Sequence, residues 1–580
     1  MKMVSRKISA IYIAFLVFFS VFSFTLFLLF LYIPYDQLIS RVTQSLKKPE
    51  LESLIRHHAF PVEKFLVLQN LARTCLILLP LLVYVLYKTR SLILGGIYFT
   101  LQTIRGGFRA WKQMYRMHSL TEKRVLFFIL LLVSGRSLYY IITKDLQYDE
   151  MWSYNYFTAA PFYFSFFMYN NYPLYELITH CFHWLPFPQK INLRLPVFLG
   201  GIAACMVFYY YLYQLFKNQS AAVLGIFLFV LMPPVTAYML YGRGVIFEIL
   251  FAIPALFSML KWLDSPEKNE QALIFIMANI LGIYSMPSHI YFWICLFLLA
   301  VFSRRLNKSM IRNFIYMNTW ILLGTFLLYS PVLLGSGFSF LISVLNPVVK
   351  TNWSQLPALL GSLGMFITGF RYGLWVLIIP CLSLLAIRKR FAYYHNLILA
   401  CLILSVLPVL FYALQRILIP TRALAFLSLV LPLTAGVIWN EFAGRSGKKI
   451  QFAILALSGI GAAEISHSHN AINWSNQLDR HVVELSLVFL NNGISSCYDS
   501  CTANQFGYFY PGLEYYYRQE GRTIRLNLGN PKSLRYKPYS NADSYDCIVR
   551  DTDSSPTISG GKEEILYRWP ERGFEVVRIR

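Results

Sequence analysis

Three carboxylates stand directly behind a membrane-length apolar run, in the stretch TKDLQYDEMWSY at residues 143–154. They are Asp145, Asp149 and Glu150, and the run before them begins RVLFFILLLVSGRSLYYII. A carboxylate at such a position can act as a general base toward a hydroxyl group. Acidic residues there can also cap the N-terminus of the next helix, which requires no catalytic role. Both interpretations stay open for each carboxylate.

Four further polar side chains are expected on the same side of the membrane as these carboxylates. They are Arg243 in YGRGVIFE, His289 in YSMPSH, and Arg416 and Arg422 around the turn RILIPTR. A guanidinium group binds two phosphate oxygens at once, so clustered arginines at the headgroup level suit a lipid-linked phosphate. Each arginine alone has another interpretation, in which it snorkels from a span to the interface.

Membrane helices must position these residues. The chain has 580 residues, of which 57% are hydrophobic and 14% charged, and its mean hydropathy is +0.50, which excludes an ordinary soluble globular protein. Reading apolar runs of about 20 residues predicts about thirteen spans. They cover residues 8–33, 66–88, 124–143, 195–216, 221–241, 244–262, 271–285, 289–303, 313–335, 371–387, 395–414, 421–440 and 450–466. The first run is longer than the apolar part of a signal peptide and lacks a cleavage site, so we interpret it as a retained anchor.

The basic residues predict the orientation of these spans. With the N-terminus inside, the segments KTR, RRLNKSMIR, RKR and GRSGKK all fall inside, as does the basic stretch at 105–124, which satisfies the positive-inside rule. The net charge of +24 is therefore a signature of topology, and no nucleic-acid partner is expected. The carboxylates fall at the outer surface. An integral, multi-pass location in a bacterial inner membrane is expected.

Three regions follow from this topology. Residues 1–123 contain two N-terminal spans and a basic cytoplasmic segment, and residues 124–466 form a helical core with an outer loop at 144–194. Aromatic residues and interspersed prolines in residues 150–190 predict short interfacial or re-entrant helices. Residues 467–580 change character: GISSCYDS, TIRLNLG, YDCIVRD and FEVVRIR read as strands and FGYFYPGLEYYYRQEG as a helix. This region is expected to be a small extracytoplasmic α/β domain.

Several motifs resemble those of one enzyme family. They are YDEMWSY after a span, NNYPLYELI about twenty residues later, RLPVFLGGIAACMVFYYYLYQLF, YGRGVIFEILFAIPALFSML, GIYSMPSHIYFWICLFLLAVF and PTRALAFLSLVLPLTAG. In this order they are similar to polyprenyl-phosphate-dependent glycosyltransferases of the GT-C fold, a group that includes protein O-mannosyltransferases, aminoarabinose transferases and RgtA-like enzymes. The resemblance covers residues 120–465.

The resemblance implies a role for each candidate residue. It carries the general base to Asp149, with Glu150 as its acidic neighbour in the catalytic pair. It carries the donor phosphate to Arg243 and Arg422, with Arg416 and His289 as further candidates at the same face. Two positions depart from the family: this chain has Tyr172 where many relatives carry His, and Ala423 where they carry Tyr.

The residue types are consistent with this chemistry. A phosphate leaves readily, so transfer needs mainly a base for the acceptor hydroxyl and cations for the developing charge on the phosphate. We expect a single displacement that inverts the anomeric centre. The donor would be a polyprenyl-phosphate-linked sugar, and the acceptor a glycan, lipid or protein. No cofactor and no obligatory metal are expected, since DTD at 551–553 reads as a turn after a strand.

Other interpretations stay open. A transporter or lipid-linked-sugar flippase would have many spans too, although such proteins place polar groups near the midplane rather than at one face. A scaffold for envelope assembly would explain the spans but not the carboxylates and arginines. In an oxidising compartment Cys497 and Cys501 could close a small disulfide, whereas inside the cell they would stay reduced.

Overall fold

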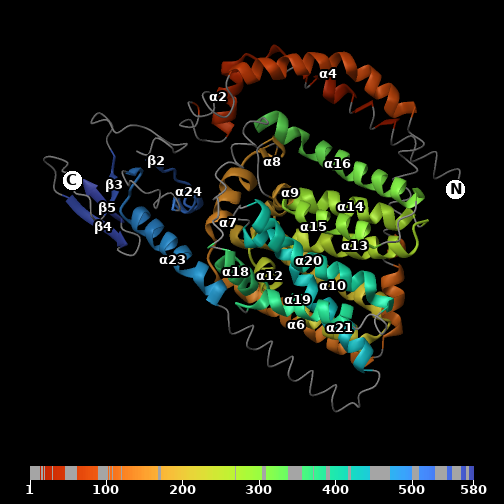
Figure 1. Ribbon diagram of the computed structural model, residues 1–580. Coiled ribbons are helices and arrows are strands. Elements are labelled where there is room, and N and C mark those ends of the chain that lie inside the picture. Colours follow the sequence, from red (N-terminus) through yellow and green to blue (C-terminus); the bar gives the residue numbers. More distant parts are fainter. Residues whose placement is uncertain are drawn as a thin grey trace. The chain divides into compact units, whose positions relative to one another are not determined.

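A computed structural model describes most of the chain, and Figure 1 shows its elements. The described residues are 13–14, 17–18, 20–25, 27–28, 31–45, 52, 62–88, 102, 105–107, 109–118, 120–162, 164–167, 172–267, 269–303, 308–336, 354, 356–369, 371–386, 392–415, 420–443, 470–499, 509–528, 545–551, 563–569 and 574–579. The chain divides into two compact units. The first comprises Met1–Lys123 with Ser330–Ile342, and the second Arg124–Tyr329 with Ser343–Arg580.

The larger unit contains a bundle of apolar helices. Its long helices are α6 (Leu120–Thr143), α10 (Gln189–Phe216), α11 (Gln219–Leu231), α13 (Val245–Asp264), α14 (Asn269–Ser285), α15 (His289–Phe302), α16 (Lys308–Ser336), α18 (Leu356–Thr368), α19 (Gly373–Ala386), α20 (His395–Gln415) and α21 (Val430–Ala443). α13 is largely buried, with fifteen of its twenty residues inside the protein. Gly200 and Gly201 let α10 approach its neighbours closely, because a Cβ there would collide with Phe247 and Met239.

Five helices are long and apolar enough to cross a membrane, or six if the bent pair α18 and α19 is one span, within the described residues. The chain is thus an integral membrane protein. By length and apolar composition, the described residues do not reach the expected total of thirteen spans. One expected span, 221–241, is wrong as a single helix because Pro233 and Pro234 follow Met232 and separate α11 from the short helix α12 (Pro233–Tyr238). The expected span 450–466 lies outside the described residues.

Short helices occupy the region expected to be an outer loop. They are α7 (Tyr148–Ser153), which continues into the π-helical turn η3 (Tyr154–Thr158), then α8 (Phe164–Phe167) and α9 (Pro173–His183). Two short 3-10 turns, together named η6 (Thr421–Leu429), follow Pro420 and lead into α21. A kink at Leu424, with φ −118° and ψ 22°, separates them.

The C-terminal region forms a five-stranded sheet in the order β2-β1-β3-β5-β4. The strands are β1 (Ser496–Asp499), β2 (Arg525–Leu528), β3 (Cys547–Asp551), β4 (Glu563–Trp569) and β5 (Phe574–Ile579), with helices α23 (Asn470–Asn491) and α24 (Tyr510–Gln519). β1 is parallel to β2 and β3, whereas β5 is antiparallel to β3 and β4. The four expected strands and the expected helix are all present, and β4 and α23 were not expected.

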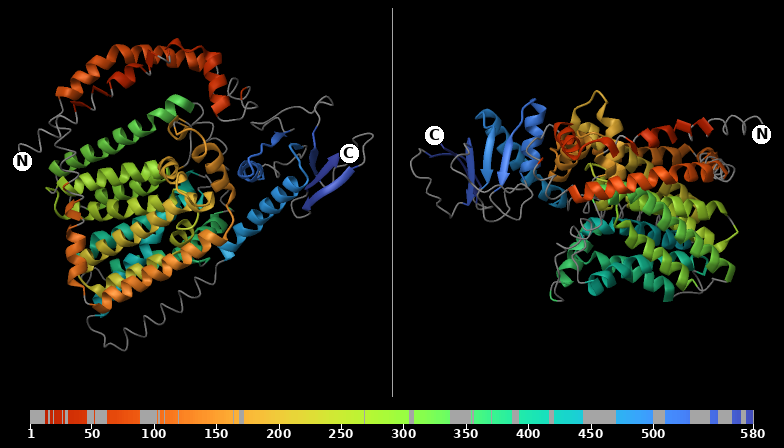
Figure 2. Two further views of the ribbon diagram at one scale, coloured as in Figure 1. Left: turned by 180° about the vertical axis from the view of Figure 1, so that it is seen from behind. Right: turned by 90° about the horizontal axis from the view of Figure 1, so that it is seen from above.

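The sheet and α24 share a hydrophobic core with helix α7. Met151 and Tyr154 of α7 and η3 pack in one cluster with Val482 of α23, Leu513 of α24 and Val576 of β5. Figure 2 shows α24 and the strands beside the end of the bundle where α7 lies. Because of this common core, the C-terminal region belongs to the same compact unit as the bundle. Cys497 is buried on β1 opposite Cys547 on β3, and Cys501 lies outside the described residues.

The smaller unit is built on helix α4 (Val62–Lys88), with the interfacial-type helix α2 (Tyr35–Ser45) before it. The Tyr35 ring packs against that of Phe65, and the Gln69 side-chain amide donates to the Leu31 carbonyl over 3.2 Å. These contacts join the segment ending at residue 32 to α4.

Candidate active site

Asp149 lies between two arginines that are far from it in sequence. Its Oδ2 atom is 2.6 Å from Nη2 of Arg243 and 3.5 Å from Nη1 of Arg422. The carboxylate stands in the first turn of α7, Arg243 in the turn before α13, and Arg422 in the first turn of η6. About a third of the Asp149 side chain is exposed (30%), so a ligand can reach the cluster. The structure brings these three expected residues together; their roles stay predictions.

The cluster carries an excess of positive charge. One carboxylate faces two guanidinium groups, which leaves one uncompensated cation. Burial lowers the pKa of Arg243, but the Asp149 carboxylate, together with Tyr172, Tyr238 and Glu150, outweighs this and holds the pKa above its ordinary value, so Arg243 stays charged. Its Nε–H is buried and has no hydrogen-bond partner among the described residues. A buried donor without a partner is costly.

Glu150, expected beside Asp149 in the catalytic pair, points the other way. Its carboxylate is fully buried (0% exposed) and forms a bidentate pair with Arg194 of α10, at 2.8 Å from Nε and 2.7 Å from Nη2. It also accepts hydrogen bonds from the backbone N–H groups of Gly242 over 2.7 Å and Gln147 over 2.8 Å. The structure therefore does not bring this carboxylate to the arginine cluster, because neighbouring residues of a helix point about 100° apart.

The capping interpretation holds for Glu150. It is the third residue of α7, and its bond from the N–H of Gln147 completes a capping box at the start of that helix. Burial raises the pKa of Glu150, but the Arg194 guanidinium and the backbone donors outweigh it and hold the pKa below its ordinary value. Glu150 is thus an ionised anchor inside the protein.

Arg194 is a member of this site that sequence reasoning did not assign. Besides Glu150, it donates to the backbone carbonyls of Lys144 over 2.7 Å, Asp145 over 2.6 Å and Ile141 over 3.3 Å. These bonds join the end of α6, the turn after it and α7 to α10. The sequence did contain a signal for Arg194, because an arginine at the start of an apolar run, two residues before Pro196, needs a buried partner.

The two glycines around Arg243 make its turn possible. A Cβ on Gly242 would collide with the Tyr175 hydroxyl, and the N–H of Gly242 donates to Glu150. A Cβ on Gly244 would lie 2.8 Å from the Ser285 carbonyl oxygen and 2.9 Å from the Tyr172 ring. Gly242 therefore packs against Glu150 and Gly244 against Ser285 and Tyr172, and Arg243 between them lies next to Asp149. The buried Glu150 carboxylate thus helps to position both Asp149, its neighbour in α7, and Arg243.

Tyr172, the position where relatives carry His, also belongs to the cluster. It precedes α9, is buried, and lies within electrostatic reach of Arg422, Arg243 and Asp149. Burial raises its pKa and outweighs the two arginines, so the phenol stays neutral. A neutral hydroxyl here can donate to an anion or accept from a sugar hydroxyl.

His289 is not part of this cluster. His289 begins α15, is fully buried, and has its Nδ1 atom 3.9 Å from Oε1 of Glu248 on α13. Its ring lies on α14, where a Cβ on Gly282 would meet it, and it makes no ion pair with Asp149. Arg416 lies outside the described residues.

The C-terminal region holds the segment that carries Asp149. The side-chain amide of Asn155 donates to the Pro511 carbonyl over 2.8 Å, and the Tyr156 hydroxyl donates to Glu514 over 3.1 Å. Gly512 lets α24 pack closely against α23, because a Cβ at this position would collide with the Val482 side chain. α7 is thus held between Arg194 on one side and α24 on the other.

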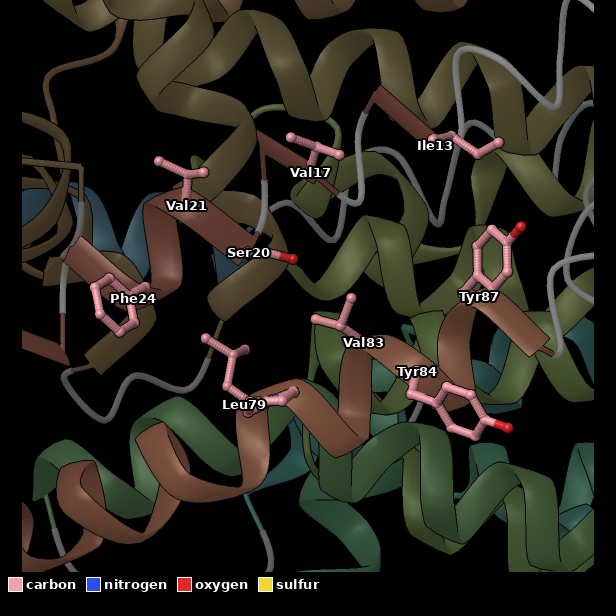
Figure 3. A pocket seen from close by; sticks show the side chains of 10 residues that line it. Ile13, Val17, Ser20, Val21, Phe24, Leu79, Val83, Tyr84 and Tyr87 are labelled. Atoms are coloured by element: carbon pink, nitrogen blue, oxygen red, sulfur yellow. The ribbon is translucent and has the colours of Figure 1, made fainter.

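An apolar groove of about 670 Å³ lies elsewhere, in the smaller unit (Figure 3). Aliphatic and aromatic side chains of α4 and of residues 13–24 line it, including Val17, Phe24, Leu79 and Tyr84. It contains no charged residue, so it offers nothing to bind a phosphate or activate a hydroxyl.

Comparison with known proteins identifies the fold. No protein-family model matches the chain, and no curated protein matches it. Among solved structures, the crystal structure of ArnT from Cupriavidus metallidurans bound to undecaprenyl phosphate is similar over 79% of this chain and 98% of its own, with a TM-score of 0.50 and 13% identity. The same protein in the apo state covers 77% of this chain and 97% of its own, with a TM-score of 0.47 and 14% identity. Identity this low establishes the fold alone. The chain therefore has the fold of ArnT, which confirms its resemblance to GT-C fold glycosyltransferases at the level of the fold.

Proposed function

We propose that this protein is a membrane glycosyltransferase that moves a sugar from a polyprenyl-phosphate carrier to an acceptor hydroxyl at the outer face of the membrane. The observation that carries the proposal is the position of Asp149 between Arg243 and Arg422, at 2.6 and 3.5 Å. A carboxylate and two guanidinium groups at one accessible point supply a base and an anion site together. The similar ArnT structure was solved with undecaprenyl phosphate, which supports a carrier of this class.

The donor phosphate would bind to the two arginines. The side chains of Arg243 and Arg422 are 15% and 33% exposed, so a phosphate can reach both guanidinium groups. Binding of the phosphate would compete with Asp149 for the guanidinium groups and release this carboxylate toward the acceptor. The ion pair with Arg243 therefore holds the base in place until the donor arrives.

The reaction would be a single displacement. The acceptor oxygen attacks the anomeric carbon, the bond from that carbon to the phosphate oxygen breaks, and the phosphate leaves with the bonding electrons. Asp149 takes the hydroxyl proton, and Arg243 and Arg422 stabilise the charge that develops on the phosphate. Attack from the face opposite the leaving group inverts the anomeric centre.

The test uses the full chain in nanodiscs with a panel of undecaprenyl-phosphate sugars. Release of undecaprenyl phosphate and formation of a new glycosidic bond are followed by mass spectrometry. Replacing Asp149 by Asn should lower the rate by about 10²–10⁴-fold, the usual contribution of a general base. Transfer by D149N at the wild-type rate would remove Asp149 from this role, and movement of label across sealed vesicles without a new bond would identify a transporter instead.

The orientation belongs to the same proposal. The Lys- and Arg-rich segments predict that Asp149 and the C-terminal sheet face the outside of a bacterial inner membrane. With the exposed Cys181 first replaced by Ser, a cysteine at Lys190 in the first turn of α10 should react with an impermeant maleimide added to intact spheroplasts. A cysteine at Lys261 near the end of α13 should not react. The opposite pattern of labelling would refute an outer active site.

A further inference from the structure

Helix α6 carries two cationic side chains and a tyrosine ring along one side, at the end that leads to α7. Arg136, Tyr140 and Lys144 are spaced four residues apart, and the Lys144 N–H continues the helix by donating to the Tyr140 carbonyl. The three side chains therefore lie one above another. Arg136 stands seven residues before Thr143, the last residue of α6, which is about 10 Å inside the span. An arginine at this depth in an apolar helix needs a polar environment for its guanidinium group.

Both cations are turned toward the same ring. The guanidinium carbon of Arg136 is 5.9 Å from the centroid of the Tyr140 ring, and Nζ of Lys144 is 5.7 Å from it. Arg136 thus reaches along α6 toward its end, whereas Lys144 reaches back into the span. A tyrosine ring attracts a cation but has no charge, so it neutralises neither of them. Two like charges drawn to one ring repel each other, and an anion beside both would relieve this repulsion.

The stripe of these three side chains lies at the seam between α6 and α10. Ile141 of α6 packs in one cluster with Phe198 of α10 and Leu240, and Tyr140 packs against that cluster. All three members of the stripe are partly exposed, so the seam is open to a ligand. A basic seam between two membrane helices at their ends is a typical place for a lipid head group.

The other charged groups at this end of α6 offset one another. Lys190 in the first turn of α10 lies within electrostatic reach of Asp145, the residue after the stripe. Glu150 and Arg194 form the buried ion pair described above. The two cations of the stripe therefore remain as an excess of positive charge.

The side of α6 next to the stripe is apolar and faces the bilayer. Leu132 and Tyr139, about one turn before and after Arg136, are 55% and 62% exposed. Only 22% of this span is buried inside the protein. Acyl chains can lie along this side while a phosphate group meets the two cations. One helix thus offers a surface for each part of a phospholipid.

We propose that Arg136 and Lys144 bind the phosphate of an anionic phospholipid whose acyl chains lie along the exposed side of α6. This inference depends on the membrane span alone and not on the proposed glycosyl transfer. The depth of Arg136 selects a lipid over a soluble phosphate, because a soluble anion would have to leave water to reach it. The bound lipid would hold the end of α6, where the Lys144 and Asp145 carbonyls accept hydrogen bonds from Arg194.

The test is native mass spectrometry of the full chain, delipidated in a nonionic detergent, with phosphatidylglycerol or phosphatidylcholine of the same acyl chains added. Wild-type protein should bind phosphatidylglycerol more tightly. Replacing both Arg136 and Lys144 by Gln should weaken this binding about thirtyfold, or about fivefold for each cation alone. R136K/K144R keeps both charges and should bind as wild type does. Arg371→Gln is the matched control and should change nothing, because Arg371 is an exposed cation on another segment.

Several results would overturn the lipid site. Equal binding of the two lipids by wild type does so, as does unchanged binding by R136Q/K144Q. Equal weakening by R371Q assigns the effect to overall charge instead. Displacement of phosphatidylglycerol by equimolar glycerol phosphate assigns the cations to a soluble anion. If R136Q/K144Q does not fold, wild type alone decides: more ammonium acetate should weaken binding of phosphatidylglycerol more than that of phosphatidylcholine, and equal weakening refutes the site.

Discussion

Replacing Glu150 by Gln tests whether this carboxylate is an anchor rather than a catalyst. Four donors converge on the Glu150 carboxylate, two from Arg194 and one each from the backbones of Gly242 and Gln147, all at 2.7–2.8 Å. A glutamine oxygen replaces one carboxylate oxygen, but its NH₂ group then faces donors, and Arg194 loses its counter-charge. Breaking a buried pair in this way costs about 3–5 kcal/mol. We therefore expect E150Q to lower the free energy of unfolding by that amount.

The assay is chemical unfolding of the purified full chain in detergent micelles, followed by near-UV circular dichroism. Asp149→Asn is the matched comparison, because that carboxylate is next in sequence but partly exposed. Its loss should change the free energy of unfolding by less than about 1 kcal/mol. The order should reverse for the rate of glycosyl transfer, which D149N should lower by about 10²–10⁴-fold and E150Q by less.

A double variant tests the ion pair between Glu150 and Arg194 without leaving one of the two charges unpaired. Replacing Glu150 by Leu and Arg194 by Met removes both charges, so the protein should be more stable than E150Q even though three backbone carbonyls lose their donor. The anchoring role is refuted if E150Q unfolds within about 1 kcal/mol of wild type, or if the double variant is no more stable than E150Q.

Three further predictions follow from the same geometry. Arg422→Ala and Arg243→Lys should each raise the KM for the polyprenyl-phosphate sugar or lower kcat by about 10²–10³-fold, the usual cost of losing a group that stabilises developing charge. Initial rates at varied donor concentration measure this effect. A variant whose rates depend on donor concentration as in wild type would contradict the prediction. Gly512→Val should lower transfer without removing any charged group, because the new side chain meets Val482 of α23 and lies against Met151 of α7, so α24 must shift relative to both helices. A stable variant with wild-type rates would show that α24 does not hold the base. The pKa of Glu150 is lower in the folded than in the unfolded protein, so its ionised carboxylate stabilises the fold above the unfolded value of 4.5. This contribution is lost as the pH falls through the lower folded-state pKa. The free energy of unfolding, measured against pH, should show this loss on the acid side in wild type and not in E150Q.

Sequence reasoning located the active cluster through topology. Once the basic segments oriented the spans, Asp149, Arg243 and Arg422 had to stand at the same membrane face, since each lies at the outer end of a predicted helix. The structure shows charged nitrogens of Arg243 and Arg422 at 2.6 and 3.5 Å from the Asp149 carboxylate. His289 satisfied the same topological rule, yet it turns into the bundle toward Glu248. A span end specifies the membrane face but not the direction of a side chain around the helix.

The boundaries of the helices were less predictable. Hydropathy reads 221–241 as one span because apolar residues continue on both sides of Pro233 and Pro234, although the backbone breaks there. β4 was missed because EEILYRW lacks the strict alternation of a half-buried strand, and its register is irregular between Ile565 and Tyr567.

The sequence by itself determined that this is a multi-pass membrane protein with acidic and basic side chains gathered at one face, because both properties follow from composition and from the order of apolar and charged segments. Only the tertiary structure decided which of two adjacent carboxylates meets the arginines. Asp149 and Glu150 are chemically equivalent in the sequence, and their separation depends on the rotation of α7, which Arg194 and α24 impose from opposite sides. That rotation is a product of long-range packing, which adjacent residue types do not encode.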